Sequence, residues 1–443
     1  MGRPARFLGP SPEPIAPVSY TDRLAMTQSQ DILMHALIPS ARNRPSEDPI
    51  FAIHGAALAR AAKGEDVIDA SLGTLMDEDG GLSVMPTVIR ALAQVNPAKA
   101  AAYAPIAGER GFNQAVVQEV FGPAGLAQDS LCVATAGGTG ALHHAVVNFL
   151  ERGESLLTTD YYWGPYSTIA DQAGRGVQTF RMFNAERRFD LAALEQGLHE
   201  LAGRQERILL ILNFPCHNPT GYSLGGAEWR DVVQILRGVD RSKPMAVVLD
   251  LAYAKFGAPG TDAWVHHIAD LAQDIPILAA WSASKSFAQY GARIGGLVVA
   301  HGDAEERTRI GNALSYTCRG TWSNCNHLGM LAITELLSHP ELRASVDRDR
   351  DALLSMLGER VEIFNREAVQ HGLHYPRYEG GFFVTIFTSD PIQTAQRCQA
   401  DGVFVVPIRG AVRVALCATP KAQVARLVAS LASGVQGLQG AIQ

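Results

Sequence analysis

Short apolar runs alternate with stretches of helical spacing between residues 131 and 300, and this alternation constrains the fold more than any other feature of the chain. In "GALHHAVVNFLERG", residues 140–153, apolar positions recur every three or four residues, as on one face of a helix. Apolar strands separated by helices are typical of a parallel sheet covered by helices. The predicted strands are residues 131–137, 155–160, 207–214, 245–251, 276–282 and 294–300.

The pattern changes after about residue 325, where long helical stretches are followed by short strand-like runs such as "GFFVTIF" and "AVRVALC". We therefore expect an α/β fold with a large domain, whose mostly parallel sheet is covered by helices, and a smaller α+β domain built from both chain ends. The expected domains are residues 75–330 for the large one and residues 28–74 with 331–443 for the small one. Residues 1–27 read as a flexible tail, and the pattern leaves Met1 and Met26 open as the start.

Composition excludes several classes of partner. The 443 residues carry a formal net charge of −6, which argues against nucleic acid or an anionic membrane surface as the main partner. No apolar stretch approaches the roughly 18 residues that a membrane span needs. Six cysteines without paired spacing indicate reduced thiols and a cytoplasmic protein. The pairs His143–His144 and His266–His267 lack further ligands at metal-binding spacing, so no metal is expected.

Polar and charged side chains follow four of the predicted strands. Because open α/β sheets bind ligands beyond the carboxyl ends of their strands, these residues should be considered together. A glycine-rich helix start could hold a phosphate, and an isolated lysine among apolar residues needs a special reason. Taken singly, each has a plain alternative as a turn or a surface residue. The strand-end residues are Gly138, Thr139, Asn218, Asp250, Tyr253, Ser282, Ser284, Lys285 and Arg293.

The segment "SASKSFAQYGARIGG", residues 282–296, resembles the lysine signature of class I aminotransferases, which are pyridoxal 5'-phosphate (PLP) enzymes of fold type I. "NPTG" and "DLAY" precede it in the order that the family shows. "DPIFAI", "YAPIAGERGFNQAV" and "RGTWSN" are similar to the aspartate and aromatic aminotransferase branch in particular. The resemblance covers roughly residues 47–430.

The resemblance implies a role for each strand-end residue. Lys285 would bond covalently to the cofactor aldehyde and later move a proton at the substrate α-carbon. Asp250 would pair with the pyridine nitrogen, and Tyr253 and Asn218 would contact the phenolic oxygen of the ring. The phosphate would be held by Gly138, Thr139, Ser282, Ser284, Arg293 and, from the partner subunit of a homodimer, by an equivalent of Tyr103.

Further residues are implied for ring stacking and for the substrate. Trp163 would stack on the ring and line the substrate site, with Tyr161 or Tyr162 as alternatives, since the residues around this tryptophan depart from the family. Asn218 and Phe382 would also line the substrate site. Arg413, with Arg409 as its rival, would bind the α-carboxylate. Arg319 would reach across the dimer to bind a side-chain carboxylate.

Two departures bear on specificity. The family's "SNPP" reads "SNCN" after Arg319, and the segment "SLGTLMDEDGG", which would close over the substrate, is shorter than in the family. The leading hypothesis is an aminotransferase that moves an amino group from aspartate, glutamate or an aromatic amino acid to a 2-oxo acid such as 2-oxoglutarate. A lyase or decarboxylase with the same cofactor is the alternative. A cofactor-binding regulator is a third reading, which the short N-terminal segment does not favour.

Overall fold

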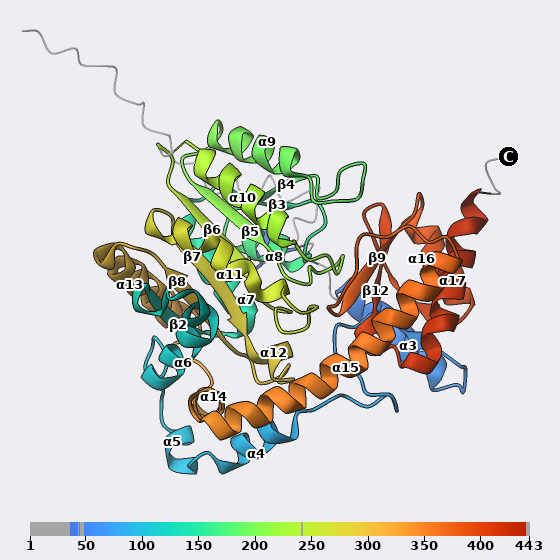
Figure 1. The fold of residues 1–443 in the computed structure, drawn as a ribbon, viewed down its shortest axis with the longest axis horizontal. Helices are drawn as coiled ribbons and strands as arrows, with labels where there is room; N and C mark the ends of the chain where they lie inside the picture. Colours follow the sequence, from blue (N-terminus) through green and yellow to red (C-terminus); the bar gives the residue numbers. More distant parts are fainter. Residues whose placement is uncertain (1–35, 43, 45–47, 241, 440–443) are drawn as a thin grey trace, which may run out of the picture. The chain divides into compact units, whose positions relative to one another are not determined.

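The computed structural model describes residues 36–42, 44, 48–240 and 242–439 (Figure 1). The chain divides into two units, residues 1–48 and 49–443. In the first unit the structure describes one short helix, α2 (Pro39–Arg42). The expected tail, residues 1–27, and Met26 lie outside the described residues. All that follows concerns the second unit.

A seven-stranded sheet with strand order β2-β8-β7-β6-β5-β3-β4 forms the centre of this unit. Its strands pair in parallel except β8, which runs antiparallel to both β2 and β7. The predicted mostly parallel sheet is confirmed, and each of the six predicted strands has a counterpart; β4 was not predicted. The bounds are β2 (Ser130–Ala136), β3 (Ser155–Thr159), β4 (Gly176–Phe180), β5 (Ile208–Leu212), β6 (Met245–Asp250), β7 (Ile277–Ser282) and β8 (Ile294–Ala300).

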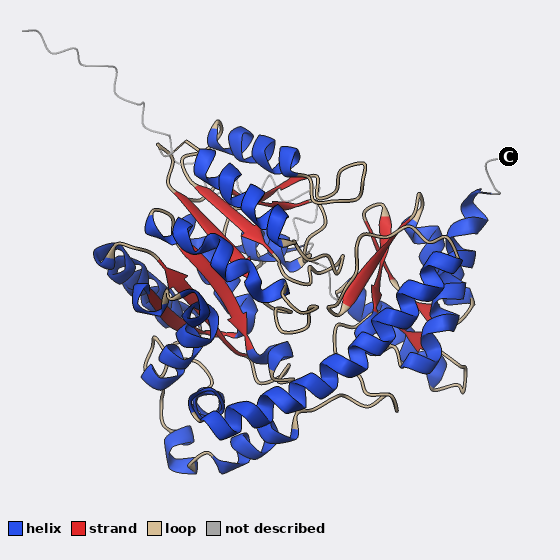
Figure 2. Cartoon of the chain, viewed as in Figure 1, coloured by secondary structure: helices blue, strands red, loops and turns tan. Residues whose placement is uncertain are grey.

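Helices cover both faces of this sheet, which is why its central strands read as unbroken apolar runs (Figure 2). On one face, Leu209, Val248 and Leu278 pack with α7, α8 and α13. On the other, Leu210 and Leu249 pack with α6, α9, α10, α11 and α14. The bounds are α6 (Arg110–Phe121), α7 (Gly137–Phe149), α8 (Pro165–Gln172), α9 (Leu191–Ala202), α10 (Gly226–Gly238), α11 (Trp264–Ile268), α13 (Ala304–Thr321) and α14 (His327–Ser338).

Two small sheets bring the ends of this unit together. β1 (Ile68–Asp69) pairs in parallel with β10 (Val403–Phe404), and β12 (Ala411–Ala415) lies between β11 (Val406–Ile408) and β9 (Phe383–Phe387). Their apolar residues share a second core. Chain segments from both ends thus build one structure, while the domain boundaries themselves stay a prediction.

The remaining helices complete the unit. The described helices not yet named are α3 (Pro49–Ala61), α4 (Pro86–Gln94), α5 (Pro97–Ala101), α12 (Ala283–Ser286), α15 (Pro340–Gln370), α16 (Pro391–Ala400) and α17 (Lys421–Gln439). Short 3-10 turns are η1 (Gly122–Ala124), η2 (Ala127–Asp129), η3 (Thr261–Ala263), η4 (Ala269–Gln273) and η5 (Leu416–Ala418). Across the described residues, none of these helices combines the length and the apolar character that crossing a bilayer requires.

The long helix α15 belongs to both cores. Its residue Val346 packs in the core of the large sheet, whereas Leu357 and Phe364, further along the same helix, pack in the core of the small sheets. In Figure 1 this helix runs from beside α14 and α4 to the small sheets. A single element of 31 residues therefore connects the two sheet regions.

Candidate active site

A pocket lies where β5, β6 and β7 end and α7 begins. Its empty volume is about 430 Å³, the open solvent at its mouth included. Every predicted cofactor residue except Tyr103 lines it. The lining residues are Gly138, Thr139, Leu142, Trp163, Asn213, Asn218, Asp250, Ala252, Tyr253, Ser282, Ser284, Lys285 and Arg293.

Lys285 enters this pocket from α12, the one-turn helix that directly follows β7. Burial, reinforced by the Arg293 charge, lowers the pKa of the Lys285 ammonium, and Asp250 opposes this shift. The Nζ atom lies 5.4 Å from the ring centroid of Tyr253. A buried amine with a lowered pKa is the form of lysine that can act as a nucleophile and as a base.

Asp250 is the last residue of β6 and is buried. Its Oδ2 accepts a hydrogen bond from Tyr166 Oη at 2.7 Å, and its Oδ1 accepts one from the backbone N–H of Ala252 at 3.1 Å. Burial raises the pKa of the Asp250 carboxyl, whereas these two donors and the Lys285 charge lower it. A buried carboxylate with such donors can form an ion pair with a cationic atom of a ligand.

Asn218 and Tyr253 lie side by side at the pocket wall. Asn218 Nδ2 donates to Tyr253 Oη at 3.4 Å, and the backbone N–H of Asn218 donates to Asn213 Oδ1 at 2.7 Å. Burial raises the pKa of the Tyr253 phenol, so it keeps its proton and can donate. Phe382, predicted to line the substrate site, does not line this pocket: it is fully buried, with its ring 5.2 Å from that of Tyr253.

Hydroxyl groups, a helix N-terminus and a guanidinium converge at one end of the pocket. Ser282 caps α12 by accepting from the backbone N–H of Ser284 at 3.1 Å, and Arg293 Nη1 donates to Ser284 Oγ at 3.1 Å. Gly137 begins α7 with φ +69°, and a Cβ there would lie 2.4 Å from Arg293 Nη2. Only glycine leaves room for this approach. The donor set is that of an anion site.

Trp163 provides the aromatic wall of the pocket, and the two tyrosines before it do not line it. Tyr161 packs instead against Phe183 and Phe387, with ring centroids 6.0 and 6.1 Å away. Tyr162 shares a hydrogen bond of 2.8 Å with Ser167. The geometry therefore favours Trp163 over its alternatives as the stacking residue.

Arg413 lies in β12 and is buried, close to the pocket although not among its lining residues. Its Nη2 donates to the backbone carbonyl of Ser71 at 2.5 Å, and its guanidinium carbon lies 4.5 Å from the ring centroid of Phe383. The centroid of the same Phe383 ring lies 5.7 Å from that of Tyr253, which places Arg413 and Tyr253 against one common side chain. Its rival Arg409 is exposed.

Tyr103 and Arg319 lie outside the pocket of their own chain. Tyr103 is 92% exposed. Arg319 is exposed in the last turn of α13, where its Nη1 donates to Ser323 Oγ at 2.6 Å. Both residues were predicted to act on the site of a partner subunit, and neither lines the pocket of its own chain.

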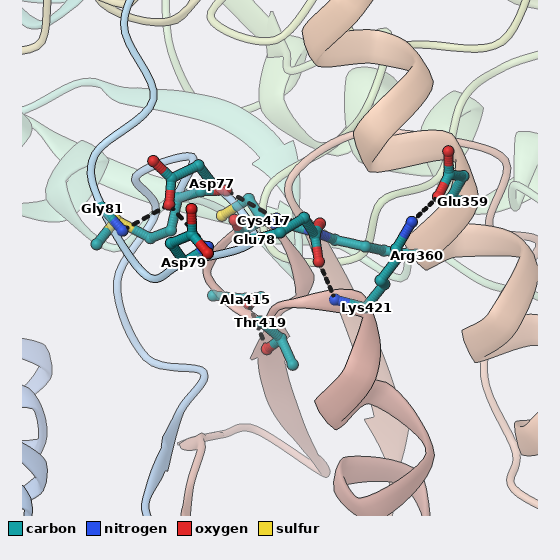
Figure 3. Close-up of polar contacts among 11 residues, drawn as sticks. Asp77, Glu78, Asp79, Gly81, Glu359, Arg360, Ala415, Cys417, Thr419 and Lys421 are labelled. Atoms are coloured by element: carbon teal, nitrogen blue, oxygen red, sulfur yellow. Dashed lines mark hydrogen bonds and ion pairs between the residues drawn. The ribbon is translucent and has the colours of Figure 1, made fainter.

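Segment 71–81 is held in place by a part-buried ion pair between Arg360 and Glu78, called the clamp below (Figure 3). Arg360 is fully buried in α15 and donates twice to Glu78 Oε1, at 2.9 and 2.8 Å. It also donates to the backbone carbonyls of Met76 and Cys417, at 2.8 and 2.7 Å. The second carboxylate oxygen of Glu78 accepts from the backbone N–H of Lys421 at 2.7 Å.

Sequence reasoning missed four residues at the site. Asn213, Leu142 and Ala252 line the pocket, and Tyr166, which does not line it, donates a hydrogen bond to Asp250. Asn213 could have been found, because it is a polar residue directly after the apolar strand β5. Tyr166 gives no such signal, because it lies in α8 and meets Asp250 only in the folded chain.

Comparisons with known proteins agree with this geometry. The family model described as aminotransferase class I and II matches residues 65–431. The aromatic-amino-acid aminotransferase of Escherichia coli (strain K12) is 30% identical over 335 residues, covering 72% of this chain and 81% of that protein. The aspartate aminotransferase of Pseudomonas aeruginosa is 27% identical, covering 80% and 90%. A solved aminotransferase from Anaerococcus prevotii has a TM-score of 0.87 at 30% identity, covering 91% of this chain and all of that one.

Proposed function

The chain belongs to the class I and II aminotransferases, and from this membership we propose that the pocket at the ends of β5, β6 and β7 is its active site. The protein is a PLP-dependent aminotransferase of the aspartate and aromatic type, which transfers an amino group between an amino acid and a 2-oxo acid. These findings do not favour a lyase or decarboxylase. The observation that carries the site proposal is that Lys285 and Asp250 line one pocket.

The residues of this pocket fit PLP. The first turn of α7, the hydroxyls of Ser282 and Ser284 and the Arg293 guanidinium form a donor set suited to a phosphate. Trp163 offers a flat aromatic wall, and Asp250 offers a buried carboxylate for a protonated ring nitrogen. When bound, PLP supplies an electrophilic aldehyde carbon and a ring that accepts electrons released at the substrate α-carbon.

The residues of this chain divide the remaining work. Lys285 Nζ, with its lowered pKa, would take the proton from the substrate α-carbon and deliver it to the former aldehyde carbon of the cofactor, so that the amino group would stay on the cofactor. Asp250 keeps a negative charge beside the ring nitrogen. Tyr253 and Asn218 donate toward the phenolic oxygen of the ring from adjacent positions. Each of these roles is proposed from position and chemistry.

For the substrate, we propose that Arg413 binds the α-carboxylate and that Arg319 of the partner subunit binds a side-chain carboxylate. The buried position of Arg413, against the same phenylalanine ring as Tyr253, supports the first role. The exposed position of Arg319 supports the second, because its guanidinium is available to another chain. Aspartate, glutamate and aromatic amino acids are the proposed donors.

A homodimer follows from the same reasoning. Tyr103 would contact the phosphate in the site of the partner subunit, and its 92% exposure in the single chain leaves it available for this contact. We also propose a cytoplasmic location, which the six cysteines support, since all of them are free thiols. Sedimentation analysis and cell fractionation test these two proposals.

A panel of amino donors with 2-oxoglutarate tests the proposed function. The purified protein is expected to convert aspartate, glutamate and at least one aromatic amino acid into the corresponding 2-oxo acid, with an absorbance change of the bound cofactor in each half-reaction. Lys285→Ala should abolish the half-reaction. Turnover by that variant would remove Lys285 from its assigned role, and failure of all three donor classes would refute the proposed substrates.

A further inference from the structure

Tyr166 is a buried tyrosine that does not line the pocket but contacts two residues that do. It lies in α8 and is 1% exposed. Its hydroxyl donates to Asp250 Oδ2 at 2.7 Å. Its ring packs edge-on against Trp163, with centroids 5.7 Å apart and an interplanar angle of 86°. Tyr166 therefore connects the carboxylate of the pocket to its aromatic wall.

The direction of this hydrogen bond is fixed. Burial and the Asp250 charge raise the pKa of the Tyr166 phenol well above its usual value, so the phenol keeps its proton and acts as the donor. On the other side of the bond, burial raises the pKa of Asp250, and the Tyr166 hydrogen bond is the largest of the effects that lower it. The phenol thus favours the ionised carboxylate over the neutral acid.

We infer that Tyr166 is a positioning residue for transamination: its hydrogen bond holds Asp250 ionised and oriented toward the pocket, where the cofactor ring nitrogen requires a negative charge. This inference rests on the proposed role of Asp250. Tyr166 acts through Asp250, since Tyr166 itself does not line the pocket.

The chain contains a matched control for this pair. Tyr222 is also 1% exposed, and its hydroxyl donates to the buried carboxylate of Glu228 at 2.5 Å. Neither Tyr222 nor Glu228 lines the pocket. Tyr222→Phe therefore removes the same kind of bond without reaching the cofactor site.

The test is the dissociation constant of PLP, measured by absorbance titration of the apoprotein as a function of pH. Tyr166→Phe should weaken PLP binding about 10- to 100-fold, the equivalent of one hydrogen bond to a charged group. The loss should grow as the pH falls, because Asp250 without its donor takes up a proton at higher pH than in the wild type. Tyr222→Phe should bind PLP as the wild type does across the same pH range.

Coupling to Asp250 distinguishes a positioning role from general damage. In an Asp250→Asn background, Tyr166→Phe should cause little further loss, because the bond acts only through the carboxylate. Tyr166→His, which keeps an N–H donor, provides a second test if the phenylalanine variant folds poorly, and it should restore much of the affinity. Thermal unfolding checks that each variant is folded.

Three results would overturn the inference. The first is a Tyr166→Phe variant whose PLP affinity and pH profile equal those of the wild type. The second is a variant carrying both Tyr166→Phe and Asp250→Asn whose loss of PLP affinity is the product of the two single losses. The third is a histidine variant that binds no better than Asp250→Asn. If Asp250→Asn binds PLP as the wild type does, the proposed role of Asp250 is wrong and the inference about Tyr166 is wrong with it. If Asp250→Asn binds PLP poorly but Tyr166→Phe binds it normally, only the inference about Tyr166 is refuted.

Discussion

At the scale of single residues, two of the three charged side chains that line the pocket, Lys285 and Asp250, have pKa values shifted toward their neutral forms. Burial disfavours the ammonium of Lys285 and the carboxylate of Asp250 alike, and each is then adjusted by neighbours. Asp250 retains two donors, Tyr166 and the Ala252 N–H, whereas Lys285 faces the second cation Arg293. The result is an amine whose pKa is lowered by burial near a carboxyl whose pKa is raised by burial, a rise that the two hydrogen-bond donors oppose.

The first prediction concerns substrate selectivity and the residue Arg319. Arg319→Ala should lower kcat/KM for aspartate by the equivalent of about 2 to 5 kcal/mol, the cost of losing one partner of a charge pair, and should affect phenylalanine much less. Arg309→Ala on the same helix removes an exposed arginine paired with Glu305 and serves as the control. Steady-state kinetics with both donors measure the effect. Equal losses of kcat/KM for aspartate and phenylalanine would mean that Arg319 does not bind the side-chain carboxylate of the substrate.

A second prediction concerns the pH dependence of the free energy of unfolding and the residue His217. This histidine is buried between Thr220 and Thr159, with ring nitrogen to hydroxyl distances of 2.9 and 3.2 Å, and burial lowers its pKa to about 3. A pKa below the unfolded value of about 6.5 means that the unfolded chain binds the extra proton, so stability is lost as the pH falls below about 6.5. The loss at pH 5 should be about 2 kcal/mol.

Unfolding in denaturant at about pH 7 and at about pH 5 measures this loss. His217→Gln should reduce the difference between the two pH values, whereas His199→Gln, at an exposed position of α9, should leave it as in the wild type. If His217→Gln retains the full acid-dependent loss, another group is responsible for it.

At the scale of elements, the clamp of Arg360 and Glu78 sets the position of segment 71–81. Glu78→Gln should lower the free energy of unfolding by about 2 kcal/mol, because it leaves the buried Arg360 cation without its counter-charge. The cost stays below the ~3–5 kcal/mol of a fully buried pair, since a third of the Glu78 side chain is exposed. Denaturant unfolding of the apoprotein measures the change.

The adjacent residue of α15 supplies the control for the clamp. Glu359 pairs with Lys421 at 2.7 Å, and both side chains are about half exposed. Glu359→Gln should therefore cost less than about 1 kcal/mol. Equal costs for the two substitutions would show that the clamp contributes no more than a surface pair.

Among the secondary-structure elements, some strands could be predicted from the sequence alone and others could not. β5, β6 and β7 were predictable because they are buried along their whole length and therefore read as apolar runs. β4 was not, because it is an edge strand in which only Phe180 is buried, so "GVQTF" shows no clear pattern. The reversed direction of β8 follows from its pairing with β2 and β7, which no local pattern records.

For the site, the residues that follow strands were predictable because the carboxyl ends of parallel strands meet at one edge of a sheet. The cofactor residues predicted on that basis and by resemblance do line one pocket, except Tyr103, while their roles toward a cofactor stay a prediction. Tyr166 was not, because its bond to Asp250 joins two elements 84 positions apart. The role of Phe382 at the substrate site stays a prediction, since this residue is fully buried and does not line the pocket.

At the scale of the whole molecule, the proposed dimer makes a prediction about mixed subunits. Lys285→Ala and Arg319→Ala should each be poor catalysts with aspartate. A hybrid dimer of the two, isolated with two different tags, contains one site in which neither substitution is present, if Arg319 acts across the interface. The hybrid should regain about half of the wild-type activity, measured as aspartate turnover per dimer.

The control for this experiment combines two substitutions in the same pocket. A hybrid of Lys285→Ala with Asp250→Asn has no intact site, because both residues line the pocket of their own chain. It should remain as poor as its parents. A hybrid of Lys285→Ala with Arg319→Ala that also stays inactive would contradict the shared site.

The helix α15 has a mechanical consequence. Its 31 residues form a rod about 46 Å long, at about 1.5 Å per residue. Arg350 donates to the carbonyl of Ser286, the residue after Lys285, and Arg360 donates to the carbonyl of Met76 in segment 71–81. A tilt of about 10° around its middle would displace either end by roughly 4 Å. Because Leu357 and Phe364 of this helix pack in the core of the small sheets, such a tilt would move those sheets as one body, without any of their own strands having to rearrange.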